Sequence, residues 1–163
     1  MPSYSAVSTG WAIPATPTDM VVLQGSSTKR IRLVAVIIDG LQTTAGLNKF
    51  FLIKRSTLDT TGTFVADSIV PHKSSSPAAT AVYGHYTANP GALGTLVGNI
   101  RVINVLNPAA ASLAKDRAIL TFTDLAADEV MLLNINEEFA LNFNGAALPP
   151  GLSLDVTFIW DEV

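Results

Sequence analysis

The chain has 163 residues, a length that suits one domain with a substantial buried core. Its residues are 48% hydrophobic but only 14% charged, against about 25% charged residues in a typical soluble domain. The net charge of −3, without a basic cluster, disfavours a nucleic-acid partner, and the absence of cysteine excludes disulfides and thiolate sites. The longest apolar runs, such as residues 33–38, are far shorter than the about 20 residues that cross a bilayer, so no membrane partner is expected.

The first nineteen residues (1–19) are predicted to be an extended N-terminal arm, and residues 20–163 a single domain. The arm contains three prolines, several Ser and Thr residues and no sustained hydrophobic period. Tyr4, Trp11 and Ile13 are its large anchors, and isolated anchors of this kind suit contact with a neighbouring surface. These three residues are therefore predicted to bind a partner, and a frayed terminus is the alternative that the sequence leaves open.

From residue 20 onward the chain is a succession of short runs rich in β-branched and aromatic residues, bounded by Gly, Pro and Asn turns. About eight to ten strands at this spacing predict an all-β fold, an antiparallel β-sandwich of two layers. The last run alternates strictly, which predicts an inward face made of Leu152, Leu154, Val156, Phe158 and Trp160. The predicted strands cover residues 20–24, 29–39, 48–56, 79–86, 98–106, 117–123, 130–136, 138–144 and 152–161.

Two segments interrupt the strand pattern. Residues 108–116 are rich in Ala and Leu but amount to less than three helical turns, so a single-turn connector is expected there. Residues 57–78 are mostly turn-forming, and a loop of that length is uncommon in a compact domain unless it serves a purpose. A partner-binding loop and a plain surface excursion both fit this composition.

One of the two histidines lies in the predicted strand of residues 79–86, where alternation places Tyr83 and His85 together on the more polar face. We expect that face to meet solvent or a partner, so both residues are predicted partner contacts. A nucleophilic mechanism would need a Ser or Thr beside the histidine and a carboxylate behind it, and no G-x-S-x-G elbow occurs. The other histidine, His72, lacks the spacing and the acidic neighbours of a metal site.

The carboxylates predict no catalytic set. Glu137 and Glu138 are adjacent, so in a strand they would point to opposite faces and could not serve as a glycosidase pair. The acidic loop of residues 123–129 has no EF-hand spacing and is interpreted as a solvated turn, and residues 161–162 as a terminal tail. The glycines of residues 91–98 lack the Lys-Ser/Thr of a phosphate-binding loop. The chain is therefore predicted to be no enzyme and to have no catalytic residues, cofactor or metal.

Three stretches of the chain share their features with a known group of proteins. They are IKRSTLDTTGT (residues 53–63), VPHKSSSPAATAVYGHYTANPGALGTLVG (70–98) and NEEFALNFNGAALPPGL (136–152). With the final strand that carries Trp160, they resemble small virion proteins of tailed phages that are encoded with head genes. The most specific matches are Lys54-Arg55-Ser56-Thr57, Tyr86-Thr87-Ala88-Asn89-Pro90, and Asn144-Gly145 followed by Leu148-Pro149.

The resemblance implies a jelly-roll-like sandwich that binds the phage head as a decoration, or capsid cement, protein. The implied partners are the major capsid protein and further copies of the chain in a homotrimer, and the implied location is the virion after assembly in the host cytoplasm. Two alternatives stay open. One is a receptor- or glycan-binding module of a head or tail fibre that uses Tyr83, His85 and Tyr86, and the other is a hydrolase that depends on His85.

Overall fold

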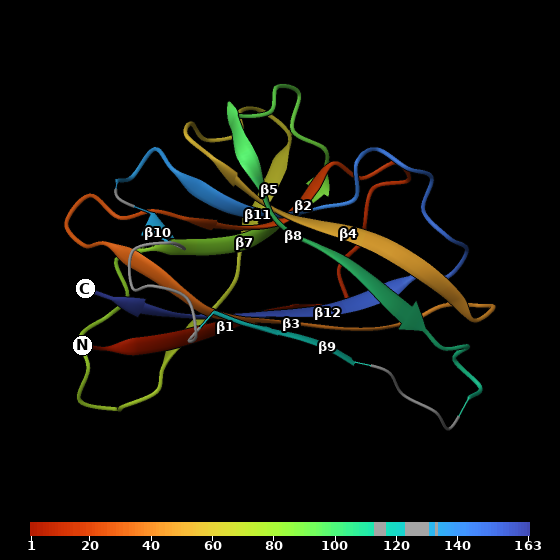
Figure 1. Ribbon diagram of the computed structural model, residues 1–163, viewed down its shortest axis with the longest axis horizontal. Helices are drawn as coiled ribbons and strands as arrows, with labels where there is room; N and C mark the ends of the chain where they lie inside the picture. Colours follow the sequence, from red (N-terminus) through yellow and green to blue (C-terminus); the bar gives the residue numbers. More distant parts are fainter. Residues whose placement is uncertain (113–116, 123–130, 133) are drawn as a thin grey trace.

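The computed structural model describes residues 1–112, 117–122, 131–132 and 134–163, and every regular element in these residues is a β-strand. The strands form two antiparallel sheets that pack face to face, as the upper and lower layers of Figure 1 show. The predicted all-β fold of two packed antiparallel sheets is thereby confirmed. Within the same ranges, no helix is long and apolar enough to cross a membrane.

The first sheet has the strand order β10-β3-β12-β1-β6, and β9 also pairs with β3. Strand β12 lies near its centre and pairs with β3 on one side and with β1 on the other. The strands of this sheet are β1 (Ser3–Thr9), β3 (Ile31–Leu41), β6 (Ile69–Pro71), β9 (Arg117–Thr121), β10 (Met131–Leu132) and β12 (Ser153–Glu162).

The second sheet has the strand order β5-β7-β2-β11-β4-β8. Its edges differ greatly in length, because β5 has 4 residues and β8 has 12. The strands of this sheet are β2 (Asp19–Gln24), β4 (Gly46–Arg55), β5 (Thr63–Ala66), β7 (Val82–Ala88), β8 (Leu96–Asn107) and β11 (Glu138–Asn142).

Large apolar side chains from both sheets fill the space between them. The five residues predicted to form the inward face of the last strand are all buried, so that prediction is confirmed. The second sheet contributes Tyr83, whose ring centroid lies 6.3 Å from that of Trp160 and 5.5 Å from that of Phe158. Phe50 and Phe139 belong to the same core.

The predicted extended N-terminal arm (residues 1–19) is wrong for residues 3–9, which form β1 inside the first sheet. Strand β1 pairs with β12 from Ser3 to Thr9 and with β6 from Tyr4 to Ala6. Its buried positions alternate along the strand at Tyr4, Ala6 and Ser8. Two of these three inward residues are small, so the strand has little hydrophobic contrast between its faces. The alternation of β1 is therefore not visible when only large apolar side chains are considered.

Four further expectations are corrected by the structure or lie partly or wholly outside the described residues. The segment 57–78, expected to be one long loop, contains β5 and β6. The connector expected at 108–116 forms a turn at 110–111 and no helix up to residue 112, and residues 113–116 lie outside the described residues. Within the strand expected at 130–136, the structure describes β10 at 131–132 and a turn in which the Glu137 amide donates to the Asn134 carbonyl (3.3 Å), and residues 130 and 133 lie outside the described residues. The acidic loop at 123–129 also lies outside the described residues.

Candidate functional site

The tyrosines predicted to contact a partner lie in the core of their own chain. Tyr4 and Tyr83 are both 0% exposed. The Tyr4 hydroxyl donates to the Pro77 carbonyl (2.9 Å), and the Tyr83 hydroxyl donates to the Val156 carbonyl (2.7 Å). The face of β7 that carries Tyr83 therefore points between the sheets, and its interpretation as an outward polar face is wrong. A polar aromatic can face inward when a backbone carbonyl accepts its hydroxyl proton.

The other three aromatic or apolar candidates also contact their own domain. Trp11 and Ile13 are half-buried against the main core, and the Trp11 and His85 ring centroids lie 5.4 Å apart. These side chains hold the segment after β1 against the sandwich. His85 and Tyr86 are buried as well, so the residues that the glycan-binding alternative would expose do not form a surface platform.

Ser8, Asp67 and His85 meet in the structure, but not in the order of a catalytic triad. The Ser8 hydroxyl donates to Oδ2 of Asp67 (2.5 Å), and Nδ1 of His85 lies 2.9 Å from the same oxygen. The carboxylate therefore stands between the serine and the histidine. In a nucleophilic triad the imidazole stands in the middle and accepts the hydroxyl proton. These contacts tie β1 to the strand pair β5–β7, and they do not activate Ser8.

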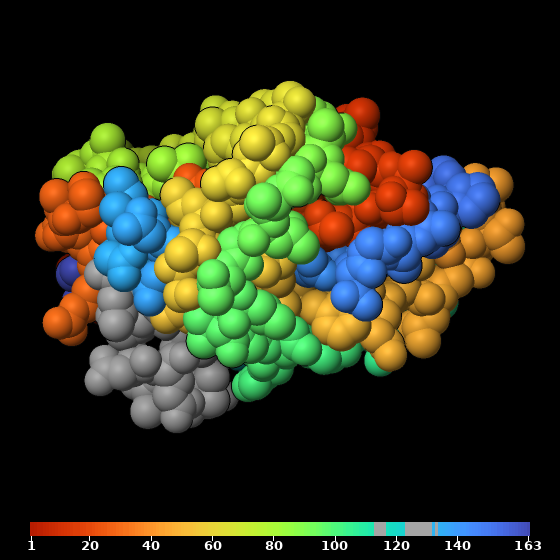
Figure 2. Space-filling view, turned by 90° about the horizontal axis from the view of Figure 1, so that it is seen from above, coloured from red at the N-terminus to blue at the C-terminus, as the bar shows by residue number. Residues whose placement is uncertain are grey.

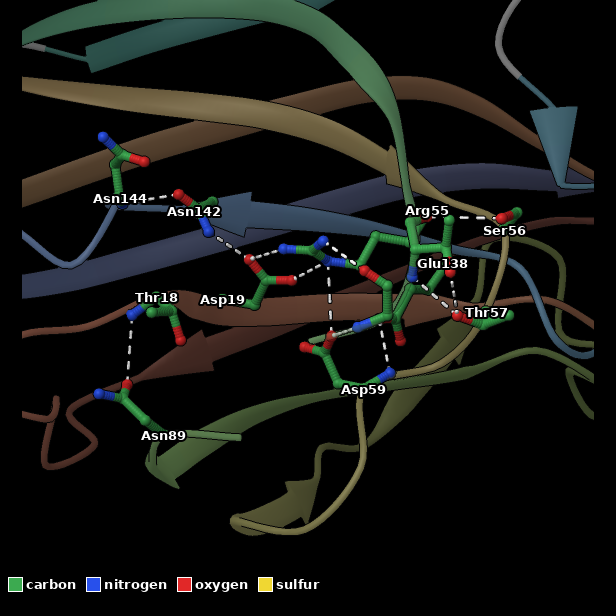
Figure 3. A network of polar contacts seen from close by, with 12 residues as sticks. Thr18, Asp19, Arg55, Ser56, Thr57, Asp59, Asn89, Glu138, Asn142 and Asn144 are labelled. Atoms are coloured by element: carbon green, nitrogen blue, oxygen red, sulfur yellow. Dashed lines mark hydrogen bonds and ion pairs between the residues drawn. The ribbon is translucent and has the colours of Figure 1, made fainter. Parts of the chain in front are cut away.

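A buried ionic network lies on the outer face of the second sheet (Figure 3). Glu138, Ala140 and Asn142 of β11 alternate with Phe139 and Leu141, which face the main core. Because side chains of a strand alternate between its faces, Glu138 and Asn142 are directed away from the other sheet. They remain buried because two chain segments, residues 56–62 and 91–95, cover this part of the sheet.

Arg55 is the centre of this network. Its Nε and Nη2 donate to the two carboxylate oxygens of Asp19, at 2.6 and 3.1 Å, and its Nη1 donates to the Gly94 carbonyl (2.7 Å). Its Nε also lies 3.4 Å from Oδ1 of Asp59. The side-chain amide of Asn142 donates to Asp19 from the other side. The fork geometry of a guanidinium suits this two-point contact with a carboxylate.

Three carboxyl groups share the single guanidinium. Oε1 of Glu138 accepts a hydrogen bond from the Asp59 amide (3.0 Å), which brings Glu138 beside Asp59. Burial, and then the charge of Asp59, raise the pKa of Glu138 to about 8. Burial, and then the charge of Asp19, raise the pKa of Asp59 to about 6. Burial alone would lower the pKa of Arg55, but its hydrogen bond to Asp19 and the surrounding negative charge raise it, so the guanidinium stays charged.

Gly94 closes the network from the outside. Its amide donates to Oδ1 of Asp59 (2.8 Å), and a Cβ atom at this position would lie 1.9 Å from the Thr57 carbonyl oxygen. We predict that Gly94→Ala lowers the free energy of unfolding by about 2 kcal/mol or more, because backbone, not a flexible side chain, occupies the space. Urea unfolding measures this loss. Gly98→Ala is the matched control, since a Cβ at Gly98 meets nothing within 4 Å. Equal stability of the two variants would contradict this packing.

The spacing of the carboxylates also fits a cation, but the observed contacts do not favour one. Asp19, Asp59 and Glu138 can each offer an oxygen within 4.8 Å of the others. A metal ion bound by all three would lie beside the Arg55 guanidinium, which already contacts two of them. Two cations that lie beside each other in a buried site repel each other strongly. We therefore assign no metal to the network.

The sequence pattern does not reveal this network, although one of its members, Glu138, stands out as a carboxylate. Glu138 was considered only with its neighbour Glu137, which instead lies 3.3 Å from Lys54. The available signal was in the three stretches that carry the resemblance, because they contain Arg55, Asp59, Gly94, Glu138 and Asn142. The three stretches that carry the resemblance thus each contribute residues to the same buried network.

No protein family, curated protein or solved structure matches this chain. Its function is therefore inferred from its own residues.

Proposed function

We propose that this chain is a non-enzymatic structural protein of the virion, of the head decoration type that its sequence resembles. It binds the major capsid protein and further copies of itself, most simply as a homotrimer, and its sandwich belongs to the jelly-roll-like class. The observation that supports this proposal is the exposed apolar edge formed by β8 and the residues beside it.

The second half of strand β8 lacks the usual protection of an edge strand. Among the described strands it pairs only with β4, and its sequence has no lysine or proline and one charged residue, Arg101. Edge strands of soluble proteins are commonly kept short, or are protected by lysine, proline or β-bulges. The register of β8 against β4 shifts twice in the half before Arg101 and is regular from Arg101 to Asn107. The regular half is therefore the part most able to pair with another chain.

Exposed apolar side chains accompany this edge. We define the β8 strip as Leu47, Leu93, Leu96, Val97, Val102 and Leu106, whose exposed fractions range from 43% to 67%. Figure 2 shows the segment that contains β8, in green, at the surface of the molecule. Burying one such side chain fully contributes about 1.5–3 kcal/mol, and repetition over a symmetric lattice adds these energies together. A strip of this kind suits assembly into a shell.

Lysine substitutions in the β8 strip test the proposal. The wild type is expected to be a trimer in solution, and the double variant Val102→Lys/Leu106→Lys a monomer that no longer co-sediments with tailed-phage heads stripped of their decoration protein. Both side chains point outward, so the free energy of unfolding, measured with urea, should change by no more than about 0.5 kcal/mol. Multi-angle light scattering and co-sedimentation are the measurements.

Val70→Lys is the matched control, because Val70 is an exposed valine (57%) at the opposite edge of the other sheet. It should leave both association and head binding unchanged. A wild-type chain that stays monomeric at all concentrations and binds no head would refute the proposal.

A further inference from the structure

Two carboxylate oxygens in the buried network lack a hydrogen-bond donor. Oδ1 of Asp59 accepts from the Gly94 amide and Oε1 of Glu138 accepts from the Asp59 amide. The second oxygen of each group, Oδ2 of Asp59 and Oε2 of Glu138, is buried without any hydrogen-bond partner among the described residues. A buried acceptor left without a donor costs about 1–3 kcal/mol, and more when it is charged. Such a pair needs an additional positive or donating group.

The charges around the pair leave it with a surplus of negative charge. Nε and Nη2 of Arg55 (β4) donate to Asp19 (β2) and Nη1 donates to the Gly94 carbonyl, so none of these hydrogen bonds reaches Glu138, and one guanidinium faces three carboxyl groups. Tyr86 from β7 also faces the network, and burial followed by the charges of the three carboxylates raises the pKa of its hydroxyl. A neutral tyrosine cannot balance two buried carboxylates. Two carboxylates that lie beside each other in a buried site do not both stay ionised, because binding one proton removes their repulsion.

We propose that Asp59 and Glu138 share one bound proton at neutral pH, held between Oδ2 of Asp59 and Oε2 of Glu138, and that this proton fastens segments 56–62 and 91–95 onto the second sheet. The inference does not depend on the proposed association through β8. A proton supplies the donor that both oxygens lack, and it adds no second cation beside Arg55.

The shared proton controls the attachment of both segments. Asp59 joins segment 56–62 to Glu138 of the sheet and, through the Gly94 amide, to segment 91–95. The two segments are also joined to each other, since the Thr60 amide donates to the Ala92 carbonyl (2.9 Å). Loss of the proton would place two buried carboxylates against each other at this junction. We expect the two segments to separate from the sheet together, before the rest of the sandwich unfolds.

The sign of the pH dependence follows from the raised pKa values. The folded chain keeps the proton up to about pH 8, whereas an unfolded Glu loses it near its usual pKa of 4.5. Between these values the folded state binds one more proton than the unfolded state, so stability is lost as the pH rises. The unfolding equilibrium constant should increase about tenfold for each pH unit from this proton alone.

Glu138→Gln tests the proposal in the full chain. The amide of the new side chain can donate to Oδ2 of Asp59, so it replaces the shared proton with a donor that does not titrate. Urea unfolding should be measured at several pH values. In the variant, the unfolding equilibrium constant should not rise tenfold per pH unit, and at about pH 8 the variant should be more stable than the wild type. The infrared band of a protonated carboxylic acid should be present in the wild type at neutral pH and absent in the variant. In the wild type, amide hydrogen exchange of residues 56–62 and 91–95 should accelerate with pH more steeply than the intrinsic exchange rate does.

Glu137→Gln is the matched control, because Glu137 is the adjacent residue and contacts Lys54 instead of the network. It should keep the wild-type pH dependence. If Glu138→Gln fails to fold, Asp59→Asn takes its place, since its amide can donate to Oε2 of Glu138. Identical pH profiles of wild type and variant, or no carboxylic acid band in the wild type, would overturn the proposal. Stabilisation of the wild type by Ca²⁺ at pH 8, absent in Glu138→Gln, would overturn it in favour of a bound cation.

Discussion

Deletion of residues 2–9, which removes β1, is expected to leave the chain unfolded. Strand β1 pairs with β12 on one side and β6 on the other, so its loss breaks the first sheet between two of its strands. It also removes Tyr4, which is fully buried and stacks on Trp160 with 6.0 Å between ring centroids. Truncating one buried aromatic costs about 3–5 kcal/mol, and a domain has only about 5–15 kcal/mol in total. Circular dichroism should show loss of the β signal and of any cooperative melting transition.

Tyr4→Phe separates the packing of β1 from its polar contact. The variant keeps the ring and loses only the hydrogen bond to the Pro77 carbonyl, so a loss of about 1 kcal/mol is expected. A free arm would give the opposite result for the deletion, namely a folded domain that has lost only its partner. A shortened chain that still melts cooperatively would therefore contradict the central place of β1 in the sheet.

The strands that sequence analysis predicted best are those with large apolar side chains on one face. In the run from Leu152 to Trp160, most of which forms β12, the alternation predicted the buried face correctly, because each inward position is a sizeable apolar residue and three outward positions, Ser153, Asp155 and Thr157, are polar. Strand β1 has the same period, but Ala6 and Ser8 at its inward positions are too small to reveal it. The strength of the pattern thus depends on side-chain volume as well as on periodicity.

The error in β7 has a different cause. Tyr83 and His85 were assigned to an outward face because their side chains are polar. In the structure each has a partner in the interior, the Val156 carbonyl for Tyr83 and the Asp67 carboxylate for His85. Neither partner lies near β7 in the sequence, so the assignment could be corrected only when the strand order was known.

The ionic network could not be predicted for the same reason. Its charged members come from the start of β2, the end of β4, the loop after β4 and the start of β11. Only the sheet order β2-β11-β4 brings them together. The sequence does contain a weak signal, since Arg55 ends one strand four residues before Asp59, and Asp19 opens another strand with the apolar run of residues 20–23. Such signals become specific only when the pairing of strands is known.

Replacing Arg55 by methionine is expected to destabilise the chain by about 3–5 kcal/mol, the cost of leaving a buried ion pair with one partner. Methionine fills much of the space of the arginine stem, so lost packing contributes little. The loss comes from Asp19, whose two oxygens would each lose a donor, and from Asp59, whose carboxylate would lose the cation that lies 3.4 Å away. Urea unfolding at neutral pH measures the change, and loss of the guanidinium should also raise the pKa of Asp59 further.

Two companion variants identify the cause of that loss. Arg55→Lys keeps a positive charge but not the two-point contact with Asp19, so its stability should lie between those of wild type and Arg55→Met. Adding Asp19→Asn to Arg55→Met removes one of the uncompensated carboxylates and should recover part of the loss, a coupling that a double-mutant cycle reports directly. The stability deficit of Arg55→Met should also shrink as the pH falls, because protonation neutralises the buried carboxylates that lost the guanidinium. An Arg55→Met chain within about 1 kcal/mol of wild type at neutral pH would show that the guanidinium does not hold this part of the fold together.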